Sequence, residues 1–268
     1  VLYGDLFERL LYRGSPYESV KGSANTLYDK WLEIARKNVK SGSYFEFNRN
    51  MKRIIREFDK LETVNFGQKP RVGVVGEILV KYAPTANNDI VGIIEREGGE
   101  AVVPDLIGFM NYSLFNQIWK ADELNMSQKT KRLAKLGIDA INLLEKPMNK
   151  ALEKSERFEG IESIYNIADS ASKIISIGNH TGEGWFLTGE MIELLNNDVK
   201  NIVCLQPFGC LPNHIVGKGM VKELRRQYKG ANIAPIDYDP GSSEVNQLNR
   251  IRLMMTTAKK MQKTKVNA

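Results

Sequence analysis

The stretch NIVCLQPFGCLPNHIVGKGM, residues 201–220, decides the fold and contains both cysteines of the chain. Its apolar, β-branched run Ile202–Leu205 is typical of a buried strand. A Pro-Phe-Gly turn ends this strand, and a helix is predicted from about residue 215 to residue 228. Parallel α/β sheets bind ligands outside the carboxyl ends of their strands. The sequence therefore directs attention to Cys210, which follows the strand, more than to Cys204, which lies within it.

Three further strands are predicted along the chain, at Val72–Val75, Ala101–Val103 and Asn232–Ile236. A helix over residues 90–97 separates the first two, and its right-handed crossover makes those strands parallel neighbours. Strands that alternate with helices in this way predict an α/β fold with a doubly wound parallel sheet. Such a sheet would bring the ends of its strands to one common edge.

The rest of the chain shows helical periodicity. Residues 1–68 are predicted to form an N-terminal helical segment. Residues 69–268 are predicted to form the α/β domain, interrupted by a helical excursion over about residues 109–175. Within that excursion, one helical face carries a regular apolar stripe of Leu133, Leu136, Ala140 and Leu144.

Size and charge exclude several classes of protein. The 268 residues carry a net charge of +6, but four lysines lie in the tail KKMQKTK, and without them basic and acidic residues nearly balance. No basic patch interleaved with aromatic residues predicts nucleic-acid binding, and no apolar run predicts a membrane span. We expect a cytoplasmic protein without nucleic-acid or membrane partners. The absence of a starting methionine at Val1 suggests a piece of a longer polypeptide.

Familiar nucleotide and metal motifs are absent. Gly73-Val-Val-Gly76 lacks the spacing of a dinucleotide-binding loop, and Gly217-Lys218-Gly219 lacks the remaining residues of a P-loop. The two histidines, His180 and His214, have no partner at metal-ligand spacing. The glycine-rich turns near Gly182 and Ser242 leave open a CoA- or nucleotide-binding module, although ordinary capping turns explain them nearly as well.

The two cysteines allow two interpretations. A helix start and Lys218 nearby would favour the thiolate form of Cys210, as a metal ligand requires. Iron–sulfur cubanes are held by about four thiolates, so this chain would supply only some of them. Judged from the residues alone, small buried core cysteines are favoured over cluster ligands.

Four stretches carry a family resemblance: NIVCLQPFGCLPNHIVGKGM, GEGWFLTGEM, IDYDPGSSEVNQLNRIRLMM and RVGVVGEILVKYAP. Together they resemble the C-terminal part of large proteins related to activators of 2-hydroxyacyl-CoA dehydratases, in which BadF/BcrA-type ATPase domains are fused to a dehydratase-like region. Double-cubane reductases are further relatives. The likeness covers roughly residues 70–258, and it implies a flavodoxin-like α/β architecture.

The resemblance also implies an iron–sulfur cofactor whose ligands come from more than one domain. These proteins couple ATP hydrolysis to low-potential electron transfer through iron–sulfur clusters in anaerobic metabolism. Cys210 matches the position of a cluster cysteine after a late strand, whereas Cys204 belongs to the motif of the activator-related proteins. The earlier strands, where dehydratase subunits have further cysteines, end here in Glu77 and in Pro104-Asp105. Upstream domains would therefore supply the missing thiolates.

We thus predict the C-terminal domain of an ATP-coupled iron–sulfur reductase or dehydratase-related protein. Cys204 and Cys210 are the predicted metal ligands, and Gln206, His214 and Lys218 are predicted to line the cofactor edge. The expected partners are upstream domains of the same polypeptide, including an ATPase activator module, with acyl-CoA or another small molecule as substrate. No catalytic residue is predicted, and the isolated chain is expected to be inactive. The alternative is a non-catalytic scaffold or docking domain with structural cysteines.

Overall fold

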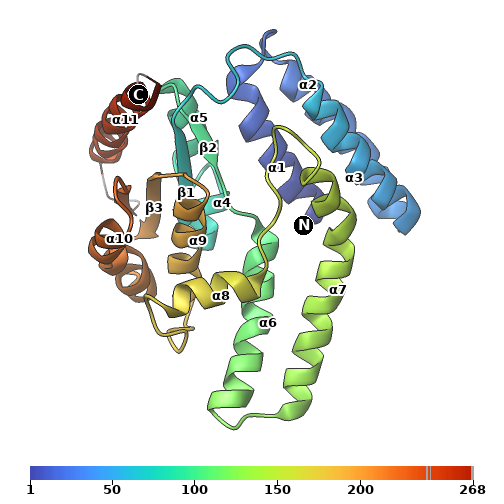
Figure 1. Ribbon diagram of the computed structural model, residues 1–268, viewed down its shortest axis with the longest axis vertical. Coiled ribbons are helices and arrows are strands. Elements are labelled where there is room, and N and C mark those ends of the chain that lie inside the picture. The colour runs from blue at the N-terminus through green and yellow to red at the C-terminus, as the bar shows by residue number, and fades with distance from the viewer. Residues whose placement is uncertain (240, 242, 267–268) are drawn as a thin grey trace. The chain divides into compact units, whose positions relative to one another are not determined.

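The computed structural model describes residues 1–239, 241 and 243–266, with side chains as far as residue 263. The chain divides into two compact units, which are drawn in Figure 1. One unit combines residues 1–65 with residues 105–164 and is helical. The other contains residues 66–104 and the chain from residue 165 onward, and it is an α/β unit.

Four parallel strands form the sheet of the α/β unit, in the order β2–β1–β3–β4. Figure 1 labels the first three of these strands. The four strands are β1 (Arg71–Gly76), β2 (Glu100–Val102), β3 (Asn201–Pro207) and β4 (Asn232–Tyr238). Val72 of β1 pairs with Ala101 on one side and with Asn201 on the other, so β1 and β3 are central. The predicted parallel pairing of the first two strands is confirmed.

Helices cover both faces of this sheet, as a doubly wound fold requires. The helices of this unit are α4 (Ile78–Tyr82), α5 (Ile90–Arg96), α8 (Ile164–Ser172), α9 (Gly184–Asn196), α10 (Val221–Gln227) and α11 (Glu244–Val266). Ile94 of α5 and Met255 of α11 pack with Val203 in one buried cluster. On the other face, a side chain at Gly73 would collide with Leu194 of α9. The fold is the predicted flavodoxin-like α/β fold.

The alternation of side chains along β3 assigns its residues to the two faces. Val203 and Leu205 belong to the cluster that contains α5 and α11. Cys204 and Gln206 alternate with these two residues along the strand. Their side chains therefore point to the opposite face, which α9 covers. Both are fully buried there.

The segment after β3 is less regular than predicted. In place of one helix over residues 215–228, the structure has a π-helical turn η2 (Asn213–Gly217), a 3₁₀ turn η3 (Lys218–Met220) and then α10. The buried hydroxyl of Thr188 donates to the carbonyl oxygen of Val216 at 2.6 Å, which satisfies that oxygen outside a helical ladder. Two glycines in this segment further weaken a regular helix.

The helical unit is built from α1 (Leu2–Gly14), η1 (Ser15–Tyr17), α2 (Ser23–Ser41), α3 (Tyr44–Asp59), α6 (Leu106–Glu123) and α7 (Gln128–Leu152). Their shared core includes Leu10, Trp31, Ile54 and Met148. Because Met148 lies in the predicted excursion, the excursion packs with the N-terminal helices. The sequence had assigned residues 109–175 to the α/β domain, whereas residues 105–164 belong to the helical unit.

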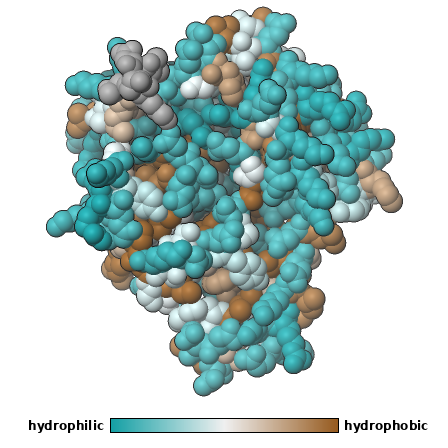
Figure 2. All heavy atoms as spheres, viewed as in Figure 1, coloured by the Kyte–Doolittle hydropathy of each residue, from teal (hydrophilic) through white to brown (hydrophobic). Residues whose placement is uncertain are grey.

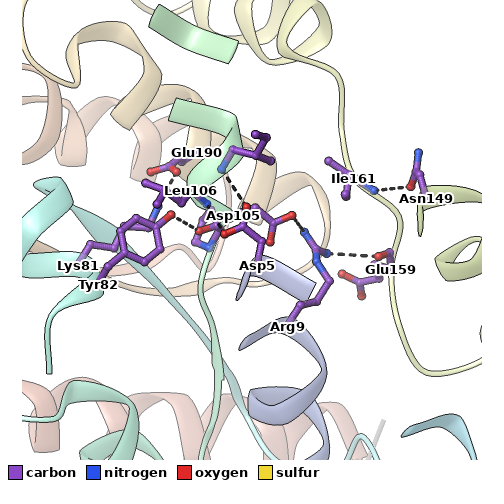
Figure 3. Close-up of polar contacts among 12 residues, drawn as sticks. Asp5, Arg9, Lys81, Tyr82, Asp105, Leu106, Asn149, Glu159, Ile161 and Glu190 are labelled. Carbon is purple, nitrogen blue, oxygen red and sulfur yellow. Dashed lines mark hydrogen bonds and ion pairs between the residues drawn. The ribbon is translucent and has the colours of Figure 1, made fainter. Parts of the chain in front are cut away.

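A buried acidic cluster occupies the start of α6 in this unit. The carboxylate of Asp5 accepts hydrogen bonds from the backbone N–H groups of Leu106 and Ile107, as Figure 3 shows for Leu106. Asp105 does not cap the helix and instead pairs with Arg9 at 2.8 Å. Glu145 of α7 is also buried, and its Oε1 has no hydrogen-bond partner. Among these groups, three carboxyl groups face one guanidinium.

The apolar stripe predicted on α7 lies on the exposed side of that helix. Leu133 and Leu136 are 59% and 64% exposed, whereas Ala134 and Ile138 are buried. The face that packs is therefore displaced by one to two residues from the predicted one, and it includes the polar Glu145. In Figure 2, apolar residues are interspersed among hydrophilic ones on the visible face.

This difference in burial predicts a difference in stability. Ile138→Val removes a methylene group from the core and is expected to lower the free energy of unfolding by about 1 kcal/mol. Leu136→Val, on the exposed side of the same helix, is expected to change it by less than about 0.5 kcal/mol. Urea titration of both variants tests the assignment. Equal losses would mean that the leucine face is covered in solution.

Candidate functional site

The candidate site lies where the direction of strand progression reverses. The chain passes from β1 outward to β2 and from β3 outward to β4, so β1 and β3 flank the switch point at which such folds bind ligands. Gly76 ends β1 with a φ of 149°, and a Cβ there would lie 2.0 Å from the carbonyl oxygen of Leu205. Glycine is required for this close approach.

Cys204 lies in the core and not at this edge. It is a central residue of β3, paired with Val75 and Pro235, and none of its surface is exposed. Burial, together with the negative charges of Glu190 and Asp237, raises the pKa of its thiol to about 12. A metal ligand must be a thiolate with access to the ion. The surroundings of Cys204 favour a structural role.

Cys210 lies at the edge, in the turn that follows β3. Gly209 has a φ of 74°, which reverses the chain, and the N–H of Cys210 donates to the carbonyl oxygen of Pro207. The side chain is half-buried. Its Sγ accepts a hydrogen bond from Asn213 Nδ2 at 3.0 Å. Of the two cysteines, only Cys210 is accessible to a ligand at the carboxyl ends of the strands.

Asn213 is held in turn by Glu183. The Nδ2 of Asn213 donates to Glu183 Oε2 at 3.0 Å, and Glu183 Oε1 accepts the N–H of Ile78 at 3.3 Å. Glu183 precedes α9, Ile78 opens α4 after β1, and Asn213 opens η2 after β3. The contacts therefore tie together three chain segments at the switch point. Both side chains are buried.

The three residues predicted to line the cofactor edge converge on Asp237 of β4. Gln206 Nε2 donates to Asp237 Oδ1 at 2.5 Å, and His214 Nε2 and Lys218 Nζ lie 3.7 and 3.5 Å from its carboxylate oxygens. Gln206 is fully buried, and its Oε1 has no partner. The sequence had placed Lys218 beside Cys210, whereas its ammonium contacts Asp237.

His214 is not arranged as a base for Cys210. Its Nδ1 lies 2.9 Å from the backbone oxygen of Cys210, and its Nε2 faces Asp237. Both ring nitrogens are therefore directed at oxygen atoms, and neither at the sulfur. This geometry does not match the nucleophile–base pair of a cysteine hydrolase.

The described residues do not form a complete metal centre. Within them, no three His, Cys, Asp or Glu side chains are grouped so that they could hold a metal ion. An iron–sulfur cluster fits this edge only as a shared group, because Cys210 alone offers it a sulfur. Cys204 does not fit the ligand set, since its thiol is enclosed between β3 and the neighbouring helices.

The structure gives no additional support to the other candidate binding residues from the sequence. Gly182 has a φ of 62° and lies against Pro212, so a Cβ at this position would be 3.4 Å from the proline ring. His180 Nδ1 lies 2.8 Å from the carbonyl oxygen of Gly178 within the same turn. Ser242 lies outside the described residues.

Sequence reasoning missed Asn213 and Glu183, whereas it placed Asp237 at the end of a strand without predicting its contacts. Asn213 lies three residues after Cys210, a spacing at which side chains meet in helical turns. Glu183 comes from a distant segment, and only the fold brings it to this edge.

Comparison with known proteins adds no further assignment: no protein-family model, curated protein or solved structure matches the chain. Among the described helices, none combines the length and the apolar character needed to cross a membrane.

Proposed function

We propose that this chain supplies one sulfur ligand, Cys210, to an iron–sulfur cluster that other domains complete. One observation carries the proposal: a half-buried thiol lies at the carboxyl end of β3, and a buried amide already donates a hydrogen bond to its sulfur. Hydrogen bonds to ligand sulfurs are a common means of adjusting clusters. Cys204 is omitted from the proposed ligand set because it is enclosed.

In this proposal the side chains of the edge have distinct tasks. A bound cluster would accept and release single electrons at low potential. Cys210 would bind one iron, and Asn213 would orient its sulfur. Gln206, His214 and Lys218 would act indirectly, because all three contact the carboxylate of Asp237 and the ammonium of Lys218 offsets its charge near the edge.

The wider system is proposed from the sequence resemblance. The remaining thiolates would come from upstream domains of the same polypeptide, which would include an ATPase activator module. The whole would be an ATP-coupled reductase or dehydratase-related protein acting on acyl-CoA or another small molecule. The absence of a second accessible cysteine among the described residues agrees with a shared cluster.

Anaerobic reconstitution tests the ligand role. The intact polypeptide containing this chain is loaded with ferrous iron and sulfide, and its iron content and visible absorption are measured. Cys210→Ala is expected to lose the iron and absorption of one cluster, because one of about four thiolates is removed. Cys204→Ala, the matched control, is expected to retain both. Unchanged iron in Cys210→Ala would contradict the proposal.

A docking role is the second candidate, and the apolar residues around Cys210 favour it. Phe208, Leu211 and Ile215 are 74%, 69% and 50% exposed. Exposed apolar groups that lie close together along a short segment are typical of contact surfaces. If docking is the only role, Cys210→Ala leaves every redox signal intact, whereas Phe208→Glu weakens attachment to the remaining domains.

A further inference from the structure

We infer that the groove between α1 and α2 of the helical unit is a binding site for a small organic anion with a flat, apolar body. The groove has a volume of about 710 Å³, and it is lined only by residues of these two helices. Sites for small molecules are typically clefts of about 300–1,000 Å³ with apolar walls and a few polar groups that fix the ligand. The inference is independent of the proposed cluster, which concerns the α/β unit.

Aromatic rings form much of the wall of this groove. The rings of Tyr3 and Phe7 are stacked with their centres 6.1 Å apart, and Tyr28 meets Phe7 edge to face at 5.3 Å. Phe7 is buried, whereas Tyr3 and Tyr28 are partly exposed. The groove therefore offers aromatic surface against which a planar ligand can pack, and such contacts contribute beyond the apolar area that they bury.

The ring of Tyr3 is held in place by two buried asparagines. Its hydroxyl donates a hydrogen bond to Asn38 Oδ1 at 2.8 Å and accepts one from Asn50 Nδ2 at 3.1 Å. Both asparagines are buried, so the hydroxyl is anchored in the core while the residue lines the groove. A wall that is ordered before the ligand arrives lowers the entropic cost of binding.

Gly4 keeps the groove open. It lies in the first turn of α1 and lines the groove, and a Cβ at this position would meet no heavy atom of the described residues within 4 Å. Its φ is not positive, so the backbone does not require glycine here, and glycine weakens a helix. The missing side chain thus leaves space that a ligand can occupy.

The charged side chains of the lining favour an anion. Arg36 and Glu33 pair with each other at 2.6 Å, which leaves Lys37, Lys40 and Glu8. Both lysines are exposed, and neither forms an ion pair with a residue that the structure describes. Two uncompensated ammonium groups beside an apolar cleft attract a carboxylate or a similar anionic group.

Titration of the full chain with naphthoate, followed by calorimetry, tests the inference. This probe is a flat ring system with one carboxylate, and naphthamide is its uncharged counterpart. Naphthoate is expected to bind at one site per chain and about fivefold more tightly than the amide, because a close charge–charge contact in an exposed site is worth about that factor. No binding of naphthoate, or equal binding of the two compounds, would overturn the inference.

Two variants locate the bound probe. Gly4→Leu fills the groove, and it is expected to fold, because leucine favours a helix, and to weaken naphthoate binding at least about tenfold. Lys40→Glu reverses one charge of the lining and should weaken it about tenfold. Lys52→Glu, the matched control, makes the same change in net charge at an exposed lysine outside the groove and should keep the wild-type affinity. Unchanged affinity in folded Gly4→Leu would place the probe elsewhere and contradict the assignment.

If Gly4→Leu does not fold, the wild-type chain still decides the question. Naphthoate should then shift the ring NMR signals of Phe7 and Tyr28 and leave those of Tyr112 in α6 in place, and unmoved signals of Phe7 and Tyr28 would overturn the inference. Sedimentation of the wild type and of Lys40→Glu tests a second copy of the chain as the occupant. A wild-type dimer that this variant converts to a monomer would assign the groove to self-association, whereas equal sedimentation of the two excludes that occupant.

Discussion

Lys81→Met is expected to lower the free energy of unfolding of the α/β unit by about 3–5 kcal/mol. Lys81 Nζ lies 2.7 Å from Glu190 Oε1, and the two side chains are 1% and 3% exposed (Figure 3). The ammonium also lies 4.8 Å from the centre of the Tyr82 ring. Removing the cation takes away the ammonium that offsets the buried charge of Glu190, and this penalty exceeds the lost packing.

The double variant Lys81→Met/Glu190→Gln is the control for this prediction. It removes both charges at nearly constant volume, so most of the lost stability should return. Hydrogen exchange of β1 and β3 amides in increasing urea measures the opening of this unit alone. A loss below about 1 kcal/mol in the single variant would mean that Glu190 reaches water or another cation.

Glu145→Gln is expected to stabilise the helical unit by about 2 kcal/mol at pH 8 and to have little effect at pH 4. Burial, with the negative charges of Asp105 and Asp5, raises the pKa of Glu145 to about 7, while Arg9 opposes the shift. Burial and Asp105 also raise the pKa of Asp5 to about 6. Both carboxyl groups therefore hold their protons more tightly in the folded state.

The sign of the pH dependence follows from these raised pKa values. The carboxyl groups of Asp5 and Glu145 stabilise the folded state fully at a pH below the pKa values near 4 that they have in the unfolded chain. This stabilisation is lost as the pH rises through their folded-state pKa values of about 6 and about 7. The wild-type helical unit should weaken between pH 4 and pH 8, and Glu145→Gln should flatten this slope. Hydrogen exchange of α6 and α7 across that range measures it. A wild-type unit that gains stability with pH would contradict the assignment.

Local patterns in the sequence were sufficient to predict the sheet. Runs such as Val72–Val75 and Ile202–Leu205 are short, apolar and bounded by turn residues. Such a local pattern identifies a buried strand with little help from distant parts of the chain. The position of Cys210 after a buried strand followed from the same reasoning. Its accessibility and its hydrogen bond to Asn213 were not predictable, because they depend on a turn whose helical regularity is broken.

Long-range packing was less predictable. The leucines of α7 form the more regular stripe, yet Ala134 and Ile138 face the core because α6 packs closely against that side. A stripe alone does not say whether a partner helix exists on its side. The grouping of residues 105–164 with the N-terminal helices likewise depends on contacts such as those of Met148, which join segments far apart in the sequence.

The enclosure of Cys204 makes its thiol a reporter of how often the interior of the α/β unit opens. Because a reagent reaches this sulfur only when the helical segments that cover this face of β3 move away, the labelling rate at this one atom is proportional to the open population when reclosing is fast. The same measurement at Cys210 records the condition of the sheet edge in the same molecule. A single time course can thus separate damage to the edge from loosening of the interior.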